Sequence, residues 1–178
     1  LRLLYNRAKT APKRVVYAEA DHIDVLKAAQ IVYDDGIAIP ILLGRKEEIE
    51  RLKEEIEFDA DVLIIDPKTD EQNAQKNKYA EVYWKQRKRR GVTLLEAQKL
   101  MRERNYFAAM MINEGDADAL ITGYSRSYPQ VVKPMLELIG LAPGSTRIAT
   151  TNVIMTERGP MFLSDTSINI NPSAKDLI

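Results

Sequence analysis

The sequence predicts an α/β protein of three layers, in which helices cover both faces of a mostly parallel β-sheet. Apolar runs at 14–20, 37–43 and 62–67 alternate with two stretches whose apolar residues have helical spacing. This β-α-β-α-β order is typical of a parallel sheet, because strands joined by helical crossovers run in the same direction. A further apolar run at 119–122 is followed by another helical pattern, which predicts one more strand-turn-helix unit.

The helices of the first half are delimited by ordinary start and stop signals. An opening helix ends before Pro12. Asp21 is expected to cap a helix over 22–35, and Gly36 to end it. A charged amphipathic helix is expected over 46–56.

The middle of the chain predicts more helix. A long polar helix is expected over 71–90, and Gly91 ends it. Thr93 and Glu96 then form a capping-box pattern that restarts the helix. The stretch 94–113 carries methionine and phenylalanine at helical spacing, and this pattern indicates core packing rather than a binding site.

The pattern changes near the end of the chain. Apolar stretches at 147–155 and 160–169 flank a short turn at 156–159. Strands so close in sequence pair as an antiparallel hairpin, because a parallel return needs a dozen or more connecting residues. The chain starts within a helical pattern and stops just after signals of a new helix, so we expect a fragment of a longer protein.

Composition excludes several classes of protein. The 178 residues carry 26 basic and 26 acidic side chains, so the chain lacks the positive excess of a dedicated nucleic-acid or anionic-membrane binder. There is no cysteine, which excludes disulfides and thiol nucleophiles. No apolar run is long enough to span a bilayer and no secretory pattern opens the chain, so a cytoplasmic protein is expected.

The turn after the strand at 119–122 is the strongest candidate for a binding site. Ser127 and Gln130 form a second capping-box pattern, and Pro129 lies in the first turn of the following helix. Ligands of open α/β sheets bind at such turns, because the helix N-terminus offers free N–H groups and a dipole that favours anions. Here the turn also carries Arg126 and two serine hydroxyls.

These residues resemble a known family. The acidic pattern at 114–118, the strand ending at Gly123, the serine-bearing turn and the Val-Lys-Pro at 132–134 are similar to phosphate acetyl- and butyryltransferases. Departures such as Thr166 resemble the phosphotransacetylase-like C-terminal region of bacterial NADP-dependent malic enzymes. The resemblance covers roughly 14–178 and implies the isocitrate/isopropylmalate dehydrogenase-like fold of phosphotransacetylases. It further implies a first domain over 1–145 and a truncated second α/β domain that begins at 146–178.

The resemblance assigns candidate ligand contacts. Arg87 matches an arginine that binds the phosphoryl group in the cleft, and a guanidinium grips such an anion through two parallel hydrogen bonds. The alternative is that Arg87 and its basic neighbours form a solvated helix C-terminus. Ser125, Arg126 and Ser127 match the phosphate-binding turn, although Ser127 is equally explained as a helix N-cap.

Two further matches complete the set. Lys133 stands where the acetyltransferases carry a second cleft arginine, and a lysine does not hold phosphate bidentately. Asp165 matches an aspartate at a strand end, with a structural role in the hairpin as the alternative. His22 is the only histidine, and the pair Asp116 and Asp118 is better explained by loop solvation than by a metal site.

Three functions remain open. The first is a regulatory region of an NADP-dependent malic enzyme, which binds acetyl-CoA or phosphate as an allosteric ligand and forms homo-oligomers. Its malate chemistry, with NADP and a divalent metal, would belong to a catalytic region in the same polypeptide. The second is a phosphate acetyltransferase or butyryltransferase, and the third is a plain oligomerisation module with an empty cleft.

Overall fold

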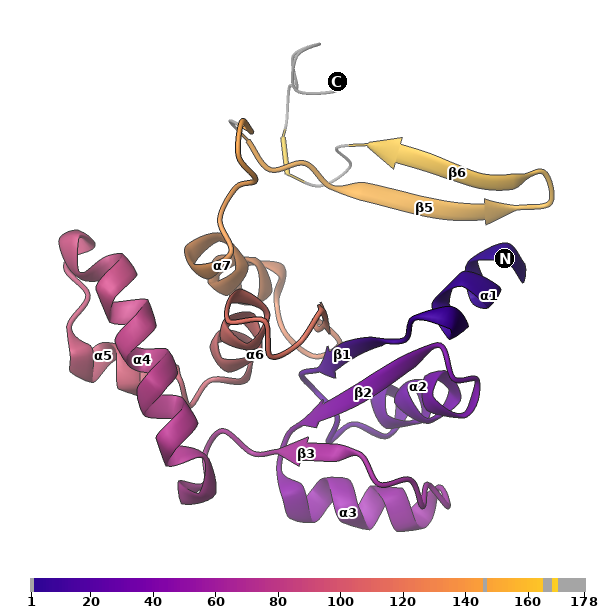
Figure 1. Cartoon of the computed structure of the whole chain (residues 1–178), viewed down its shortest axis with the longest axis horizontal. Helices are drawn as coiled ribbons and strands as arrows, with labels where there is room; N and C mark the ends of the chain where they lie inside the picture. The colour runs from indigo at the N-terminus through magenta and orange to yellow at the C-terminus, as the bar shows by residue number, and fades with distance from the viewer. Residues whose placement is uncertain (1, 146, 165–167, 170–178) are drawn as a thin grey trace. The chain divides into compact units, whose positions relative to one another are not determined.

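The computed structural model of the chain describes residues 2–145, 147–164 and 168–169, and it consists of two compact units (Figure 1). The first unit covers 1–139 and the second covers 140–178. The predicted domain boundary at 145/146 falls shortly after the division between the units. Assignment of the second unit to a truncated second domain stays a prediction.

A four-stranded parallel sheet organises the first unit. Its strands are β1 (Lys13–Tyr17), β2 (Ala38–Leu43), β3 (Leu63–Ile65) and β4 (Ala119–Ile121), in the spatial order β3-β2-β1-β4. All three pairings are parallel. The sheet and the helices around it confirm the predicted α/β class.

Helices cover both faces of this sheet. Side chains alternate between the faces along each strand, and apolar residues point to both faces, so each face packs against helices. Tyr17 and Leu42 pack against α2 (Ile23–Asp34) and α3 (Lys46–Glu55). Val16 and Ile41 belong to the opposite cluster, which contains residues of α4 (Asn73–Arg87), α6 (Arg104–Asn113) and α7 (Tyr128–Leu138). The structure therefore has the three layers that the sequence predicts.

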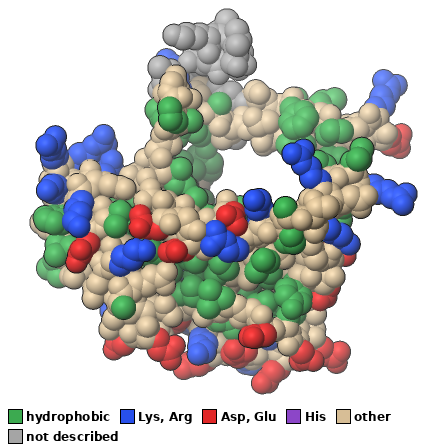
Figure 2. All heavy atoms as spheres, viewed as in Figure 1, with side chains coloured by type: hydrophobic (Ala, Val, Ile, Leu, Met, Phe, Trp, Pro, Cys, Tyr) green, Lys and Arg blue, Asp and Glu red, His purple; other side chains and the backbone are tan. Residues whose placement is uncertain are grey.

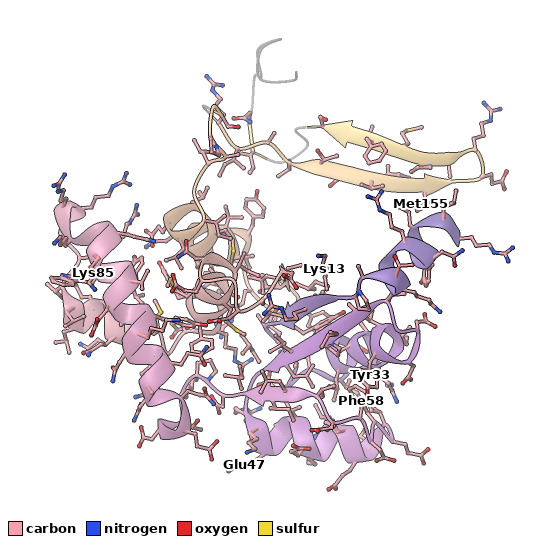
Figure 3. The ribbon with its side chains drawn as sticks, in the orientation of Figure 1. Lys13, Tyr33, Glu47, Phe58, Lys85 and Met155 are labelled. Atoms are coloured by element: carbon pink, nitrogen blue, oxygen red, sulfur yellow. The ribbon has the colours of Figure 1, made fainter. Side chains whose placement is uncertain are left out.

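Aromatic contacts join neighbouring elements within these layers. Tyr33 at the end of α2 packs edge-on against Phe58, which follows α3, with 5.8 Å between ring centroids (Figure 3). Tyr79 of α4 contacts Phe107 of α6, with ring centroids 5.2 Å apart. The stripe of large apolar residues on α6 is fully buried, as the prediction of core packing requires.

The helical stretch predicted over 94–113 is interrupted. It consists of α5 (Leu94–Leu100) and α6, separated at 101–103. Met101 is fully buried at this break, and Arg104 at the start of α6 turns its guanidinium to Asp21. The ion pair of Arg104 with Asp21 therefore lies directly after the break, and no glycine or proline marks the break in the sequence. The capping box of Thr93 and Glu96 is present at the start of α5, as predicted.

The predicted role of Asp21 as a helix cap is wrong. His22 occupies the N-cap position of α2, and no side chain caps this helix end. The carboxylate of Asp21 instead accepts hydrogen bonds from Arg104, at 2.6 Å to one oxygen, and from Arg45 at 3.4 Å. Two charge-assisted partners outweigh a single backbone N–H, so Asp21 links the end of β1 to α6.

The remaining helices surround this framework. They are α1 (Arg2–Thr10), which has no buried residue, and the short 3₁₀ segments η1 (Asp70–Gln72) and η2 (Lys88–Arg90) at the two ends of α4. Gly91 follows η2 with a φ of 91°, in the left-handed conformation expected of a helix-ending glycine.

The second unit contains the predicted antiparallel hairpin. β5 (Thr151–Thr156) pairs with β6 (Gly159–Ser164), and Thr156 lies opposite Gly159 across the turn. None of the helices that the structure describes has the length and apolar character needed to cross a bilayer.

Candidate functional site

The turn between β4 and α7 forms where the sequence predicts it. Gly123 has a φ of 102°, a left-handed conformation that glycine adopts without strain, and it reverses the chain after the strand. Ser127 is the N-cap residue of α7, and its N–H donates to the side-chain oxygen of Gln130 at 3.2 Å. This contact is one half of the predicted capping box. Pro129 lies in the first turn of α7, as expected.

The backbone N–H groups of this turn donate hydrogen bonds to a carboxylate of the protein itself. One oxygen of Glu19, at the end of β1, accepts from the N–H of Gly123 at 2.9 Å and of Tyr124 at 2.6 Å. The other oxygen accepts from the N–H and the hydroxyl of Ser125, at 3.0 and 2.5 Å. Glu19 is 3% exposed. The anion bound by the turn backbone is therefore a side chain of the protein itself, from the turn that follows β1.

The environment keeps Glu19 ionised. Burial alone would raise the pKa of its carboxyl group, but hydrogen bonds from Ser125, Tyr124 and Gly123 outweigh burial and lower the pKa. Sequence analysis missed this residue. The available signal was an acidic residue between Ala18 and Ala20 at the end of a buried strand, because a buried charge requires partners.

Two cations of the predicted site lie on one pocket. Arg126 of the turn and Lys133 of α7 line a pocket of about 240 Å³, together with Asn105, Tyr106 and Gln130. Both cations are exposed, and no ion pair to either of them occurs among residues 2–145. Glu103 also lines the pocket, so its lining carries two positive charges and one negative charge.

Arg87 is held inside the first unit rather than in solvent. One nitrogen of its guanidinium lies 3.4 Å from a carboxylate oxygen of Glu137 on α7, and the two side chains are 17% and 19% exposed. This distance exceeds the 2.7–2.9 Å typical of a charge-assisted hydrogen bond. The Nε of Arg87 is buried without a hydrogen-bond partner. The guanidinium therefore keeps unused donor capacity.

Glu137 also accepts from two tyrosines. The hydroxyl of Tyr106 lies 2.7 Å from its carboxylate and that of Tyr83 lies 3.1 Å away. Burial would raise the pKa of Glu137, but the two hydroxyls and the positive charges of Lys133 and Arg87 lower it. Burial beside Glu137 in turn raises the pKa of both tyrosines, so their hydroxyls stay protonated as donors.

Tyr106 connects Arg87 to the pocket. Tyr106 lines the pocket of Arg126 and Lys133, and its hydroxyl contacts the carboxylate that pairs with Arg87. Arg87 is not among the residues that line this pocket. The structure thus brings Arg126 and Lys133 together on one pocket, and it links Arg87 to this pocket only through Glu137 and Tyr106.

The other candidates have separate positions. Ser125 faces Glu19, and Asp165 lies outside the described residues. Asp116 accepts from the hydroxyl of Tyr79, and Asp118 pairs with Arg14 at 3.1 Å. Asp118 is exposed, as the expectation of loop solvation requires, although it also pairs with Arg14. Asp116 is partly buried and bound to Tyr79, so the expectation was wrong for this residue.

The basic residues at the end of α4 are exposed, as the sequence suggests for the neighbours of Arg87. Lys85 extends outward from α4 (Figure 3), where it lies 3.8 Å from Glu81. Lys88 lies 5.2 Å from the ring centroid of Trp84. Figure 2 shows lysine and arginine side chains gathered at this end of the first unit.

The lowered pKa values of Glu19, Asp21 and Glu137 predict acid sensitivity. A group whose pKa is lower in the folded state stabilises the fold above its unfolded pKa, and this stabilisation is lost as the pH falls through the folded pKa. The ordinary values are 4.5 for Glu and 3.8 for Asp. We expect a constant urea midpoint between pH 7 and about 5.5 and a falling one below about 4.5. A midpoint that stays unchanged down to pH 3 would contradict this assignment.

Comparison with known proteins places this arrangement in a family. The chain matches the family described as phosphate acetyl/butaryl transferase over residues 1–178. It is 33% identical to a phosphate acetyltransferase of Synechocystis over 180 residues, which cover 98% of this chain and 25% of the relative. It is 32% identical to an NADP-dependent malic enzyme of Haemophilus influenzae over 182 residues, 99% of this chain and 24% of that protein.

Solved structures agree with this match. A phosphotransacetylase from Streptococcus pyogenes superposes with a TM-score of 0.86 at 30% identity, over 99% of this chain and 55% of that structure. The EutD phosphotransacetylase from Staphylococcus aureus gives a TM-score of 0.85 at 26% identity, over 99% and 52%. The chain thus spans about half of these structures and a quarter of the two longer relatives. It belongs to the phosphate acetyl/butaryl transferase family.

Proposed function

We propose that this chain is part of a phosphotransacetylase-like regulatory region of an NADP-dependent malic enzyme. In this proposal the pocket of Arg126 and Lys133 binds acetyl-CoA or phosphate as an allosteric ligand. Oxidative decarboxylation of malate, with NADP and a divalent metal, belongs to a catalytic region elsewhere in the same polypeptide. The region is expected to form homo-oligomers.

The observation that carries this proposal is the ion pair between Arg87 and Glu137. Acyl transfer to phosphate requires cationic groups that stabilise charge as it develops on the phosphate. A guanidinium whose charge is opposed by a half-buried carboxylate is a weaker group for that task. Lys133 adds a compact ammonium, which does not hold phosphate through two parallel bonds as an arginine does.

Binding without turnover makes smaller demands on the site. Arg126 and Lys133 are both exposed on one pocket, so a phosphate group can approach each of them from solvent. Asn105 and Gln130 add amide donors to the same lining. These groups suffice to attract and orient a phosphorylated ligand. Binding alone does not require them to stabilise the additional charge that develops in a transition state.

The test uses the intact protein with two assays. Malate oxidation is measured with and without acetyl-CoA, and acetyl transfer from acetyl phosphate to CoA is measured in parallel. We expect acetyl-CoA to change the rate of malate oxidation at least twofold, and the Arg126→Gln/Lys133→Gln variant to lose this response. Acetyl transfer is expected at the background rate. Transfer above background would overturn the proposal.

A phosphate acetyltransferase or butyryltransferase is the second candidate. The relative from Synechocystis and both solved structures described above favour it, since their names state this activity. In that case Arg87 would have to leave Glu137 when phosphate binds. CoA-dependent turnover that is lost in an Arg87→Gln variant would select this candidate over the first.

Substitution of Lys133 by arginine predicts a gain in affinity. A guanidinium at this position offers two parallel donors to a phosphate oxygen pair, where the ammonium offers a point charge. We expect Lys133→Arg to bind acetyl-CoA about threefold more tightly in calorimetry, which corresponds to roughly 0.7 kcal/mol. Lys133→Gln is expected to bind more weakly, and Lys85→Arg, on the exposed end of α4, to bind as the wild type does. Equal affinity of all three variants would contradict the placement of Lys133 at the ligand.

A further inference from the structure

A second pocket is lined by residues of α4, of α5 and of the segment that follows α5 in the first unit. It has a volume of about 360 Å³ and is lined by six polar side chains: Asn73, Lys76, Asn77, Gln98, Lys99 and Arg102. Three of them are cationic and none is a carboxylate. No lining residue is shared with the pocket of Arg126 and Lys133.

Lys76 is the unusual member of this lining. It is 5% exposed, and its ammonium donates to the backbone carbonyl of Thr69 at 2.6 Å. No carboxylate lies within ion-pair distance of it in the part of the chain that the structure describes. Burial and the nearby charge of Arg102 lower the pKa of Lys76, against the opposite influence of Asp70 and Asp66. A buried ammonium without a direct counter-ion favours an anion beside it.

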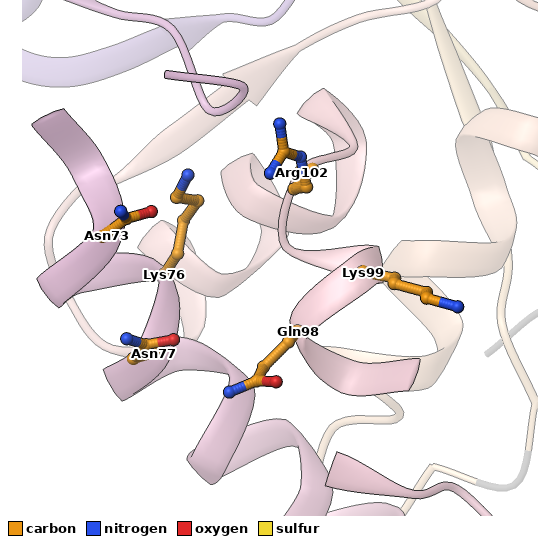
Figure 4. A pocket seen from close by; sticks show the side chains of 6 residues that line it. All are labelled: Asn73, Lys76, Asn77, Gln98, Lys99 and Arg102. Carbon is orange, nitrogen blue, oxygen red and sulfur yellow. The ribbon is translucent and has the colours of Figure 1, made fainter. Parts of the chain in front are cut away.

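Arg102 brings a second cation to the same end of the pocket. One of its terminal nitrogens donates to the carbonyl of Lys68 at 3.0 Å, and among the residues that the structure describes its guanidinium makes no other hydrogen bond, so most of its five donors are available to a ligand. Figure 4 shows Lys76 and Arg102 at one end of the pocket, while Gln98 points toward Asn77 at the other. Lys99 points away from both cations and lies at the rim.

The lining indicates the kind of ligand. Pockets for drug-like molecules are mostly lined by apolar residues with a few polar groups, whereas every side chain that lines this pocket ends in an amide or a cation. Two cations at one end suit a phosphate group, and the amides at the other end suit a hydroxylated remainder. The volume exceeds that of the pocket of Arg126 and Lys133.

We propose that the pocket between α4 and α5 is a second anion-binding site, which takes a small phosphorylated molecule with Lys76 and Arg102 on its phosphate group. The site is independent of the proposed regulatory pocket. Its ligand is either free phosphate or the monoester of a small polar molecule such as a sugar.

The experiment isolates this site by removing the other. The intact Arg126→Gln/Lys133→Gln variant is titrated by calorimetry with inorganic phosphate and with glucose 6-phosphate, at constant ionic strength. We expect saturable binding of at least one probe, and tighter binding of the sugar phosphate if the amides contact the remainder. No saturable binding of either probe would overturn the proposal.

Substitutions in that background assign the binding to this pocket. Arg102→Gln is expected to weaken it at least tenfold and Lys99→Gln, at the rim, about twofold, whereas Lys85→Gln on the same helix as Lys76 should have no effect. Lys99 and Lys85 are exposed, so these two variants are expected to fold even if Arg102→Gln does not. Unchanged affinity in both Arg102→Gln and Lys99→Gln would overturn the proposal. If the wild-type protein shows no response to acetyl-CoA, the function proposed for the pocket of Arg126 and Lys133 fails, but phosphate binding between α4 and α5 is unaffected by that result.

Discussion

Glu19→Gln is expected to lower the free energy of unfolding by about 3 kcal/mol. The carboxylate accepts three backbone N–H groups and one hydroxyl, with both oxygens in use. A glutamine keeps one oxygen and replaces the other with an NH₂ group that faces donors. Hydrogen bonds to a charged group contribute roughly 1.5–3 kcal/mol each, and unsatisfied buried donors add to the loss.

The substitution should also disturb ligand binding, because Glu19 fixes the backbone that precedes Arg126. We expect acetyl-CoA affinity to fall together with stability. Urea unfolding followed by circular dichroism measures the first effect. Glu54→Gln is the matched control, since Glu54 is exposed on α3. If the free energy of unfolding of Glu19→Gln lies within about 0.5 kcal/mol of the values for the control and the wild type, the carboxylate does not stabilise the turn.

Glu137→Gln is expected to raise the affinity for acetyl-CoA about tenfold, or roughly 1.4 kcal/mol. The carboxylate opposes Arg87 at 3.4 Å and lies near enough to Lys133 for that charge to lower its pKa. Its removal leaves these positive charges uncompensated next to the pocket. Glutamine keeps an acceptor for the hydroxyl of Tyr106, so the packing is largely preserved.

Calorimetry on the intact variant measures this gain. Glu81→Gln, which removes an exposed charge from α4, should bind acetyl-CoA with wild-type affinity. Arg87→Gln combined with Glu137→Gln should lose most of the gain, because the freed guanidinium is then absent. Equal or weaker binding by Glu137→Gln alone would argue that Arg87 takes no part in the site.

The local patterns in the sequence predicted the main elements of the fold. Alternating apolar runs identified the strands, and Thr93 with Glu96 marked a helix start that the structure confirms. The break at 101–103 was not predictable, because no glycine or proline marks it. The ion pair of Asp21 with Arg104 was not predictable either, because the two residues are 83 positions apart. Sequence separation of that size leaves no local pattern.

Only part of the candidate site was predicted, because some of its contacts are local in sequence and others are long-range. Arg126, Ser127 and Lys133 lie in one turn and helix, so their proximity follows from local geometry. The partners Glu19 and Glu137 come to Ser125 and Arg87 from 106 and 50 residues away in the chain. Sequence alone therefore indicated which groups bear charge, and the fold determines which of those charges are already neutralised.

Equilibrium binding of acetyl-CoA to the intact protein tests the central claim most directly. Calorimetry compares the wild type, Arg126→Gln/Lys133→Gln, and the control Lys85→Gln/Arg89→Gln, which removes two exposed cations from the end of α4 and η2. The pocket predicts saturable binding by the wild type and the control, with at least tenfold weaker binding by the first variant. Equal affinity in all three proteins would contradict it.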